Sequence, residues 1–88
     1  MEVNYSENAL DDIAYWKEKG TEKIRKRISK LITSIEASPF TGLGKPEPMR
    51  YEMTGKWSRR IDNKNRIIYS VAQECIRIYS LRGHYGDK

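Results

Sequence analysis

The sequence predicts an α+β fold in which two N-terminal helices pack on one face of a small, mostly antiparallel sheet. Two observations support this prediction. Apolar side chains recur at helical spacing between residues 7 and 37, whereas short β-prone runs separated by turn residues occupy residues 50–81. A chain of 88 residues can build one core. We therefore expect a single domain that spans residues 1–88.

A short strand and a helix are expected before Gly20. Val3 and Tyr5 flank a polar residue, as in a half-buried strand, and Ser6 can cap the helix that follows. Gly20 is expected to end that helix. Its apolar face, chosen by helical spacing, consists of Leu10, Ile13, Ala14 and Trp16.

A second helix is expected from Thr21 to about Ala37. Ser38-Pro39 stops it, because a residue before proline is disfavoured in the α region. One side of this helix is apolar and the other is basic. The basic side is either a solvated surface or a docking surface for RNA or an acidic partner; its residues are Lys23, Arg25, Lys26, Arg27 and Lys30.

The segment Gly42–Pro48 is expected to be a stiff loop that presents Lys45 and Glu47, since Gly and Pro at this density neither continue a helix nor sit inside a sheet. Four strands are expected after the loop. Short connectors between them predict an antiparallel meander. The helices would cover one face of the sheet and leave the other for function. The predicted strands are Arg50–Met53, Trp57–Ile61, Arg66–Val71 and Cys75–Leu81.

Charge and composition restrict the function classes. The net charge is +5, and residues 1–20 hold five acidic and two basic side chains, so the positive excess lies beyond Gly20. A basic body of this kind suits a polyanion such as nucleic acid, or serves solubility alone. Cys75 is the single cysteine, which excludes an intrachain disulfide. With no apolar run of membrane length, we expect a cytoplasmic protein that does not enter a membrane.

The side chains permit one reaction type best. One histidine and one cysteine give no zinc-ligand spacing, and no phosphate-binding or dinucleotide motif occurs, so we expect no metal and no cofactor. A carboxylate, a histidine and several arginines suffice to cleave RNA through attack of its own 2′-hydroxyl on the adjacent phosphate. Glu47 and His84 are candidates for the base and the acid. The candidate cationic clamp comprises Arg66, Arg59, Arg60 and Lys45.

Each of these residues also has an ordinary structural interpretation. Glu47 can be a surface ion-pair partner, His84 a solvated tail residue, and Arg66 a partner for Asp62. An aromatic residue beside a tail histidine has little core to fill, so Tyr85 is a candidate for stacking on a base.

Several motifs resemble those of the YoeB/Txe-type toxins of bacterial toxin–antitoxin pairs, in the RelE/ParE superfamily. The resemblance covers nearly the whole chain, with motifs in the same order and spacing. The residues that carry it are Trp16, Ser38-Pro-Phe-Thr-Gly-Leu-Gly-Lys-Pro-Glu-Pro48, Gly55-Lys-Trp-Ser-Arg-Arg-Ile61, Asn65-Arg-Ile-Ile-Tyr69 and His84-Tyr85.

The resemblance implies a RelE-like, microbial-ribonuclease-like fold and a ribosome-dependent messenger-RNA endonuclease that inhibits translation. It implies cleavage in the ribosomal A site without metal. By the same resemblance, Glu47 is the general base, His84 the general acid and Arg66 the phosphate-binding residue. The substrate-binding positions it implies are Lys45, Arg59, Arg60 and Tyr85.

The resemblance also implies partners. The antitoxins of this family, of the YefM/Axe type, carry an acidic, initially disordered tail that folds over the active-site face of the toxin. Homodimers are known in the family. The ribosome and messenger RNA complete the expected partners.

Two other functions stay open at this point. A ParE-like toxin would inhibit DNA gyrase by binding alone, and a non-catalytic module would bind RNA without cutting it. Neither alternative needs Glu47 or His84, so the catalytic set separates them from a nuclease.

Overall fold

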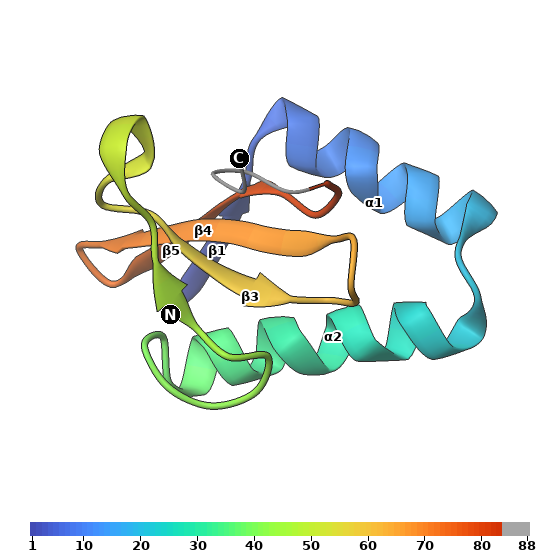
Figure 1. The fold of residues 1–88 in the computed structure, drawn as a ribbon, viewed down its shortest axis with the longest axis horizontal. Helices are drawn as coiled ribbons and strands as arrows, with labels where there is room; N and C mark the ends of the chain where they lie inside the picture. The colour runs from blue at the N-terminus through green and yellow to red at the C-terminus, as the bar shows by residue number, and fades with distance from the viewer. Residues whose placement is uncertain (84–88) are drawn as a thin grey trace.

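The computed structural model describes residues 1–83 and arranges them as two helices and a five-stranded sheet (Figure 1). None of the described helices is long and apolar enough to cross a membrane. In chain order the elements are β1 (Glu2–Tyr5), α1 (Glu7–Lys19), α2 (Glu22–Ala37), β2 (Glu47–Pro48), a 3-10 helix (Tyr51–Met53), β3 (Trp57–Arg60), β4 (Arg66–Ala72) and β5 (Cys75–Ser80).

The sheet has the strand order β1-β5-β4-β3-β2. All neighbouring strands are antiparallel except β1 and β5, which are parallel. The connection between the parallel strands β1 and β5 is long, as parallel pairing requires, and runs through both helices and strands β2, β3 and β4. The expected mostly antiparallel sheet with two N-terminal helices is therefore confirmed.

Both helices begin within one residue of the predicted start, and each has a side-chain cap. The Ser6 hydroxyl accepts a hydrogen bond from the Ala9 amide (3.0 Å), and the Thr21 hydroxyl accepts one from the Ile24 amide (3.1 Å). Each bond satisfies one of the amides that a helix start leaves without a partner. The predicted boundary at Gly20 is also confirmed.

The core lies between the two helices and one face of the sheet. The register places alternate residues of each strand on that face, so that Arg59, Ile67 and Tyr69 point inward from β3 and β4. The residues between them point to the opposite face. The buried apolar cluster consists of Ala9, Trp16, Ile28, Leu31, Ile35, Ile61, Ile67, Tyr69, Ile76, Ile78 and Leu81.

The predicted strand Arg50–Met53 is wrong. Tyr51 has a φ of 60°, which breaks an extended backbone, and Tyr51–Met53 forms a 3-10 helix. The strand occurs earlier, at Glu47–Pro48, in the segment expected to be a loop. Pro48 is tolerated there because β2 is an edge strand, where a missing amide donor removes no hydrogen bond from the interior of the sheet.

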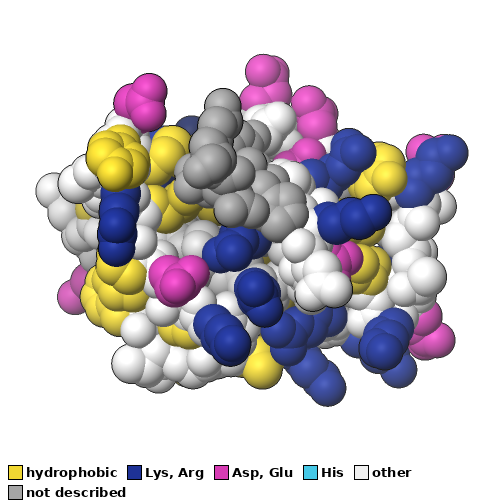
Figure 2. Space-filling model, in the orientation of Figure 1, with side chains coloured by type: hydrophobic (Ala, Val, Ile, Leu, Met, Phe, Trp, Pro, Cys, Tyr) yellow, Lys and Arg dark blue, Asp and Glu magenta, His cyan; other side chains and the backbone are white. Residues whose placement is uncertain are grey.

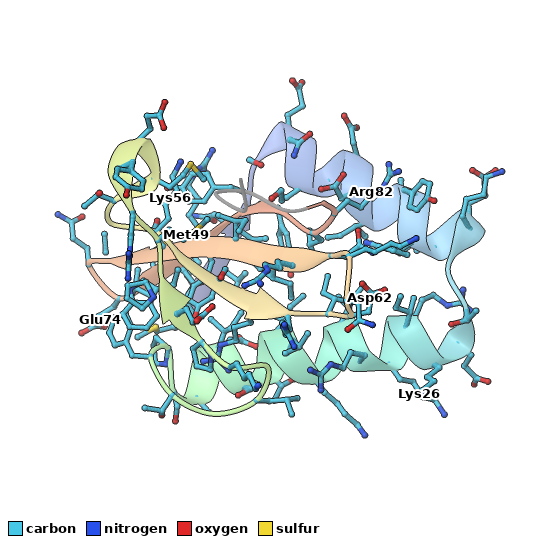
Figure 3. All side chains as sticks on the ribbon, in the orientation of Figure 1. Lys26, Met49, Lys56, Asp62, Glu74 and Arg82 are labelled. Atoms are coloured by element: carbon cyan, nitrogen blue, oxygen red, sulfur yellow. The ribbon has the colours of Figure 1, made fainter. Side chains whose placement is uncertain are left out.

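The predicted apolar face of α1 is only partly right. Leu10 is 55% exposed, whereas Asp12 is buried. The Asp12 carboxylate accepts a hydrogen bond from the Leu81 amide, and the Trp16 indole donates one to the Leu81 carbonyl, each at 2.8 Å. Arg82 then lies over the ring of Tyr15 on α1, 3.5 Å from its centroid (Figure 3). Helix α1 thereby holds the chain in place directly after β5.

Candidate active site

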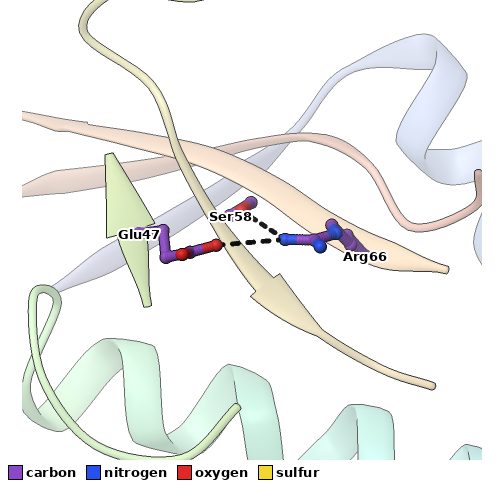
Figure 4. A network of polar contacts seen from close by, with 3 residues as sticks. All are labelled: Glu47, Ser58 and Arg66. Atoms are coloured by element: carbon purple, nitrogen blue, oxygen red, sulfur yellow. Dashed lines mark hydrogen bonds and ion pairs between the residues drawn. The ribbon is translucent and has the colours of Figure 1, made fainter. Parts of the chain in front are cut away.

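Three side chains from three strands meet on the face of the sheet opposite the core (Figure 4). Arg66 Nη1 lies 3.3 Å from Glu47 Oε1 and 3.4 Å from Ser58 Oγ. The register accounts for this meeting, because Glu47 is paired with Ser58 across β2 and β3. Strand alternation turns both toward the open face, as it does Arg66 on β4.

The carboxylate and the guanidinium differ in exposure. The side chain of Glu47 is 65% exposed, whereas that of Arg66 is 18% exposed. The carboxylate is therefore within reach of a large ligand, and the guanidinium is held close to the sheet. A carboxylate can accept a proton, and a guanidinium donates hydrogen bonds to phosphate oxygens in a fixed planar geometry.

The approach to β2 is a tight turn. Gly44 has a φ of 86°, and a Cβ at this position would lie 2.6 Å from a methyl carbon of Leu31. The Gly44 carbonyl accepts a hydrogen bond from the Arg60 amide (2.7 Å). The glycine therefore allows the chain to pass close to α2 and enter the edge of the sheet at Glu47.

Behind this face, Arg59 ties the preceding loop to the core. Its side chain is fully buried and donates to the carbonyls of Ser38, Thr41 and Leu43. It also donates to the hydroxyls of Ser34 on α2 and Tyr69 on β4. A buried cation without a carboxylate is stable only if oxygen atoms replace its water.

The structure corrects the substrate-binding role expected for Arg59. All contacts of its guanidinium are internal, so it supports the loop before β2 and presents nothing to a ligand. The neighbouring Arg60 is exposed, as is Lys45. Both remain candidates for contact with an anion. Figure 2, in the orientation of Figure 1, shows lysine and arginine side chains gathered near the centre of the molecule.

His84 and Tyr85 lie outside the described residues. Gly83, which precedes them, accepts a hydrogen bond from the Arg66 amide through its carbonyl (3.1 Å). The described chain thus ends beside Arg66. Within residues 1–83, no group of three or more His, Cys, Asp or Glu side chains is placed to hold a metal ion.

Two features of this site were missed in the sequence. Ser58 lies against Arg66, and strand alternation combined with the antiparallel pairing of β3 and β4 would have placed it there. Asp62 was considered as the partner of Arg66. Its carboxylate instead accepts hydrogen bonds from Lys64 and Asn65 in its own turn, and Glu47 pairs with Arg66.

Comparison with known proteins gives one consistent family. Residues 5–85 match the family model described as the YoeB-like toxin of bacterial type II toxin–antitoxin systems. Toxin YoeB of Escherichia coli K12 is 40% identical over 85 residues, which is 97% of this chain and all of that protein.

Solved structures agree with this assignment. A YoeB/ParE toxin from Agrobacterium tumefaciens superposes with a TM-score of 0.91 at 33% identity, covering 97% of this chain and 100% of the other. A chain of the YoeB-YefM complex from Staphylococcus aureus superposes with a TM-score of 0.86 at 34% identity, covering 97% and 98%.

Arg59→Lys is expected to lower the free energy of unfolding by about 2–5 kcal/mol. A lysine has three donors for the five acceptors that the guanidinium now binds, so at least two of these oxygens lose the hydrogen bond from residue 59. Urea denaturation measures the change. The matched control is Arg60→Lys at an exposed position, expected to stay within about 0.5 kcal/mol. Equal stability of the two variants would contradict the role of Arg59.

Tyr69 is expected to make the free energy of unfolding fall at alkaline pH. Burial raises the pKa of the Tyr69 phenol above its usual 10.0, although Arg59 opposes part of the rise. The unfolded chain therefore releases this proton at a lower pH than the folded chain, and the stability that Tyr69 contributes is lost as the pH rises through the folded-state pKa.

Comparison of the unaltered chain with Tyr69→Phe tests this. The variant loses the hydrogen bond from its hydroxyl to the Pro39 carbonyl (2.6 Å) and the one from Arg59. Near pH 8 it is expected to be less stable by about 2 kcal/mol, and the difference should shrink by about pH 11. Tyr51→Phe, at a position 83% exposed, is the control. A difference that stays constant over this range would refute the linkage.

Proposed function

The chain belongs to the YoeB-like toxins of bacterial type II toxin–antitoxin systems, and from this premise we propose that it is a ribosome-dependent endoribonuclease that cleaves messenger RNA in the A site. The observation that carries the proposal is the pairing of an exposed carboxylate, Glu47, with a cation held against the sheet, Arg66. Cleavage of the messenger stops translation, which accounts for toxicity.

The proposed reaction uses the RNA as its own nucleophile. Glu47 takes the proton from a 2′-hydroxyl, whose oxygen forms a bond to the adjacent phosphorus while the bond to the 5′-oxygen breaks. Arg66 holds the charge that develops on the phosphate oxygens. The leaving 5′-oxygen receives a proton, which we assign to His84. The products are a 2′,3′-cyclic phosphate and a 5′-hydroxyl, and the step requires no metal ion.

The Glu47–Arg66 pair suits an enzyme waiting for its substrate. An ion pair with an exposed partner contributes about 0–1 kcal/mol, so a phosphate can displace the carboxylate from Arg66 at little cost. Displacement leaves the Glu47 carboxylate free to accept a proton next to the bound phosphate. Ser58 retains its contact with Arg66 and keeps the guanidinium in place.

The remaining site residues are assigned by position and charge. Lys45 and Arg60 are exposed cations that flank Glu47 and Arg66 in the chain or across the sheet. We assign them to backbone phosphates of the RNA. Tyr85 is assigned to stacking on a base beside the cleaved bond.

We propose an antitoxin as the resting partner. The related S. aureus toxin occurs in a YoeB-YefM complex, and a YoeB dimer is known from the same organism. This chain carries a net charge of +5, which favours an antitoxin with an acidic, initially disordered tail. A homodimer is the second assembly that we propose.

Glu47→Gln is expected to reduce cleavage of ribosome-bound messenger RNA by about 10²–10⁴-fold, the usual contribution of a general base. Its stability should change by less than about 1 kcal/mol because the lost ion pair is exposed. A primer-extension assay with purified ribosomes measures the rate. His84→Ala is expected to reduce the cleavage rate by a similar factor.

Glu52→Gln is the matched control, an exposed carboxylate on the 3-10 helix that should cut at the parental rate. If Glu47→Gln also cuts at that rate, the assignment of the base is wrong. Inhibition of gyrase supercoiling by a chain that leaves messenger RNA intact would favour a ParE-like function instead.

A further inference from the structure

The turn between β3 and β4 contains a side chain that binds two parts of the chain at once. Asn65 donates through Nδ2 to both carboxylate oxygens of Asp62, at 3.0 and 3.3 Å. Its Oδ1 accepts a hydrogen bond from the Gly83 amide (2.9 Å). Figure 3 labels Asp62 in this turn.

Chemistry fixes the orientation of the Asn65 amide. A carboxylate only accepts hydrogen bonds and a backbone N–H only donates, so Nδ2 must face Asp62 and Oδ1 must face Gly83. Asp62 is itself held, because its Oδ1 also accepts from the amides of Lys64 and Asn65, each at 2.8 Å. Rotation of the Asn65 side chain would break both contacts.

Gly83 is held from two sides at the edge of the candidate site. Asn65 binds its amide, and the next residue, Arg66, donates its own amide to the Gly83 carbonyl. Gly83 has a φ of 82°, in the left-handed region, where the direction of the chain changes. His84 follows it directly in the sequence.

We propose that Asn65 is a positioning residue for catalysis: it fixes Gly83, the residue before His84 in the sequence, beside Arg66. This inference rests on the proposed nuclease function and on the assignment of His84 as the acid. Asn65 touches neither substrate nor reacting atoms. It acts through the position of the acid relative to Arg66. A shift of a catalytic group by about 1 Å can lower the rate roughly 10²-fold.

A swap of two side chains tests the proposal. Asn65→Asp keeps an acceptor for the Gly83 amide, but it removes the Nδ2 donor and places a second carboxylate against Asp62, so repulsion should displace the side chain of residue 65 and weaken its contact with Gly83. We expect kcat to fall about 10–100-fold while KM changes less than about threefold. Adding Asp62→Asn supplies a donor toward residue 65, which removes the repulsion and returns the carboxylate of residue 65 to the Gly83 amide. The double variant should recover kcat to within about threefold of the unaltered chain.

Asn63→Asp is the matched control, with the same chemical change at an exposed position of the same turn. It is expected to leave kcat unchanged, which separates positioning from the added negative charge. Hydrogen exchange of the Gly83 amide, measured by NMR, reports on the contact without any activity. It should accelerate in Asn65→Asp and slow again in the double variant.

Different outcomes test the positioning role and the proposed function. Full activity of Asn65→Asp, or a double variant that regains Gly83 protection but no activity, would overturn the positioning role. If the unaltered chain leaves ribosome-bound messenger RNA intact, the proposed function fails. The Gly83 exchange pattern then still decides whether Asn65 holds the chain as the structure places it.

Discussion

The buried guanidinium of Arg59 is the constraint on which the rest of the site depends. It has no carboxylate partner, and its charge is stabilised by three loop carbonyls and two hydroxyls. The loop from Ser38 to Leu43 cannot move without leaving this cation unsolvated, at a cost that exceeds most single interactions in a domain of this size. The position of that loop determines where β2 begins, and hence where Glu47 lies.

Two neighbouring arginines on β3 lie on opposite faces of the sheet. Arg59 points into the core and Arg60 to the open side, because successive strand residues alternate between faces. The same alternation brings Ser58 to Arg66 and Tyr69 to Arg59. The core face thus fixes the backbone, and the opposite face holds an ion pair whose carboxylate is exposed and which therefore contributes little to stability.

The sequence predicted the elements whose signals are local. Both helices followed from apolar spacing, the first also from its Ser6 cap, and the strand at Arg66 from its β-branched run. The edge strand at Glu47 was missed because prolines argue against a strand unless its place at the edge is known. The burial of Arg59 and Asp12 was missed because their partners are far away in the sequence. Motif resemblance predicted Glu47 and Arg66 as site residues, and only the register explains why the two side chains meet.

The chemistry of the RNA ends tests the central claim most directly. Purified chain is added to ribosomes that hold a defined messenger, and the termini of the fragments are identified by enzymatic treatment and mass spectrometry. Attack by the 2′-hydroxyl, with Glu47 as base and Arg66 on the phosphate, predicts a 2′,3′-cyclic phosphate on one fragment and a 5′-hydroxyl on the other, with cleavage only when ribosomes are present. Fragments that carry 5′-phosphate and 3′-hydroxyl ends, or a messenger that stays intact, would contradict it.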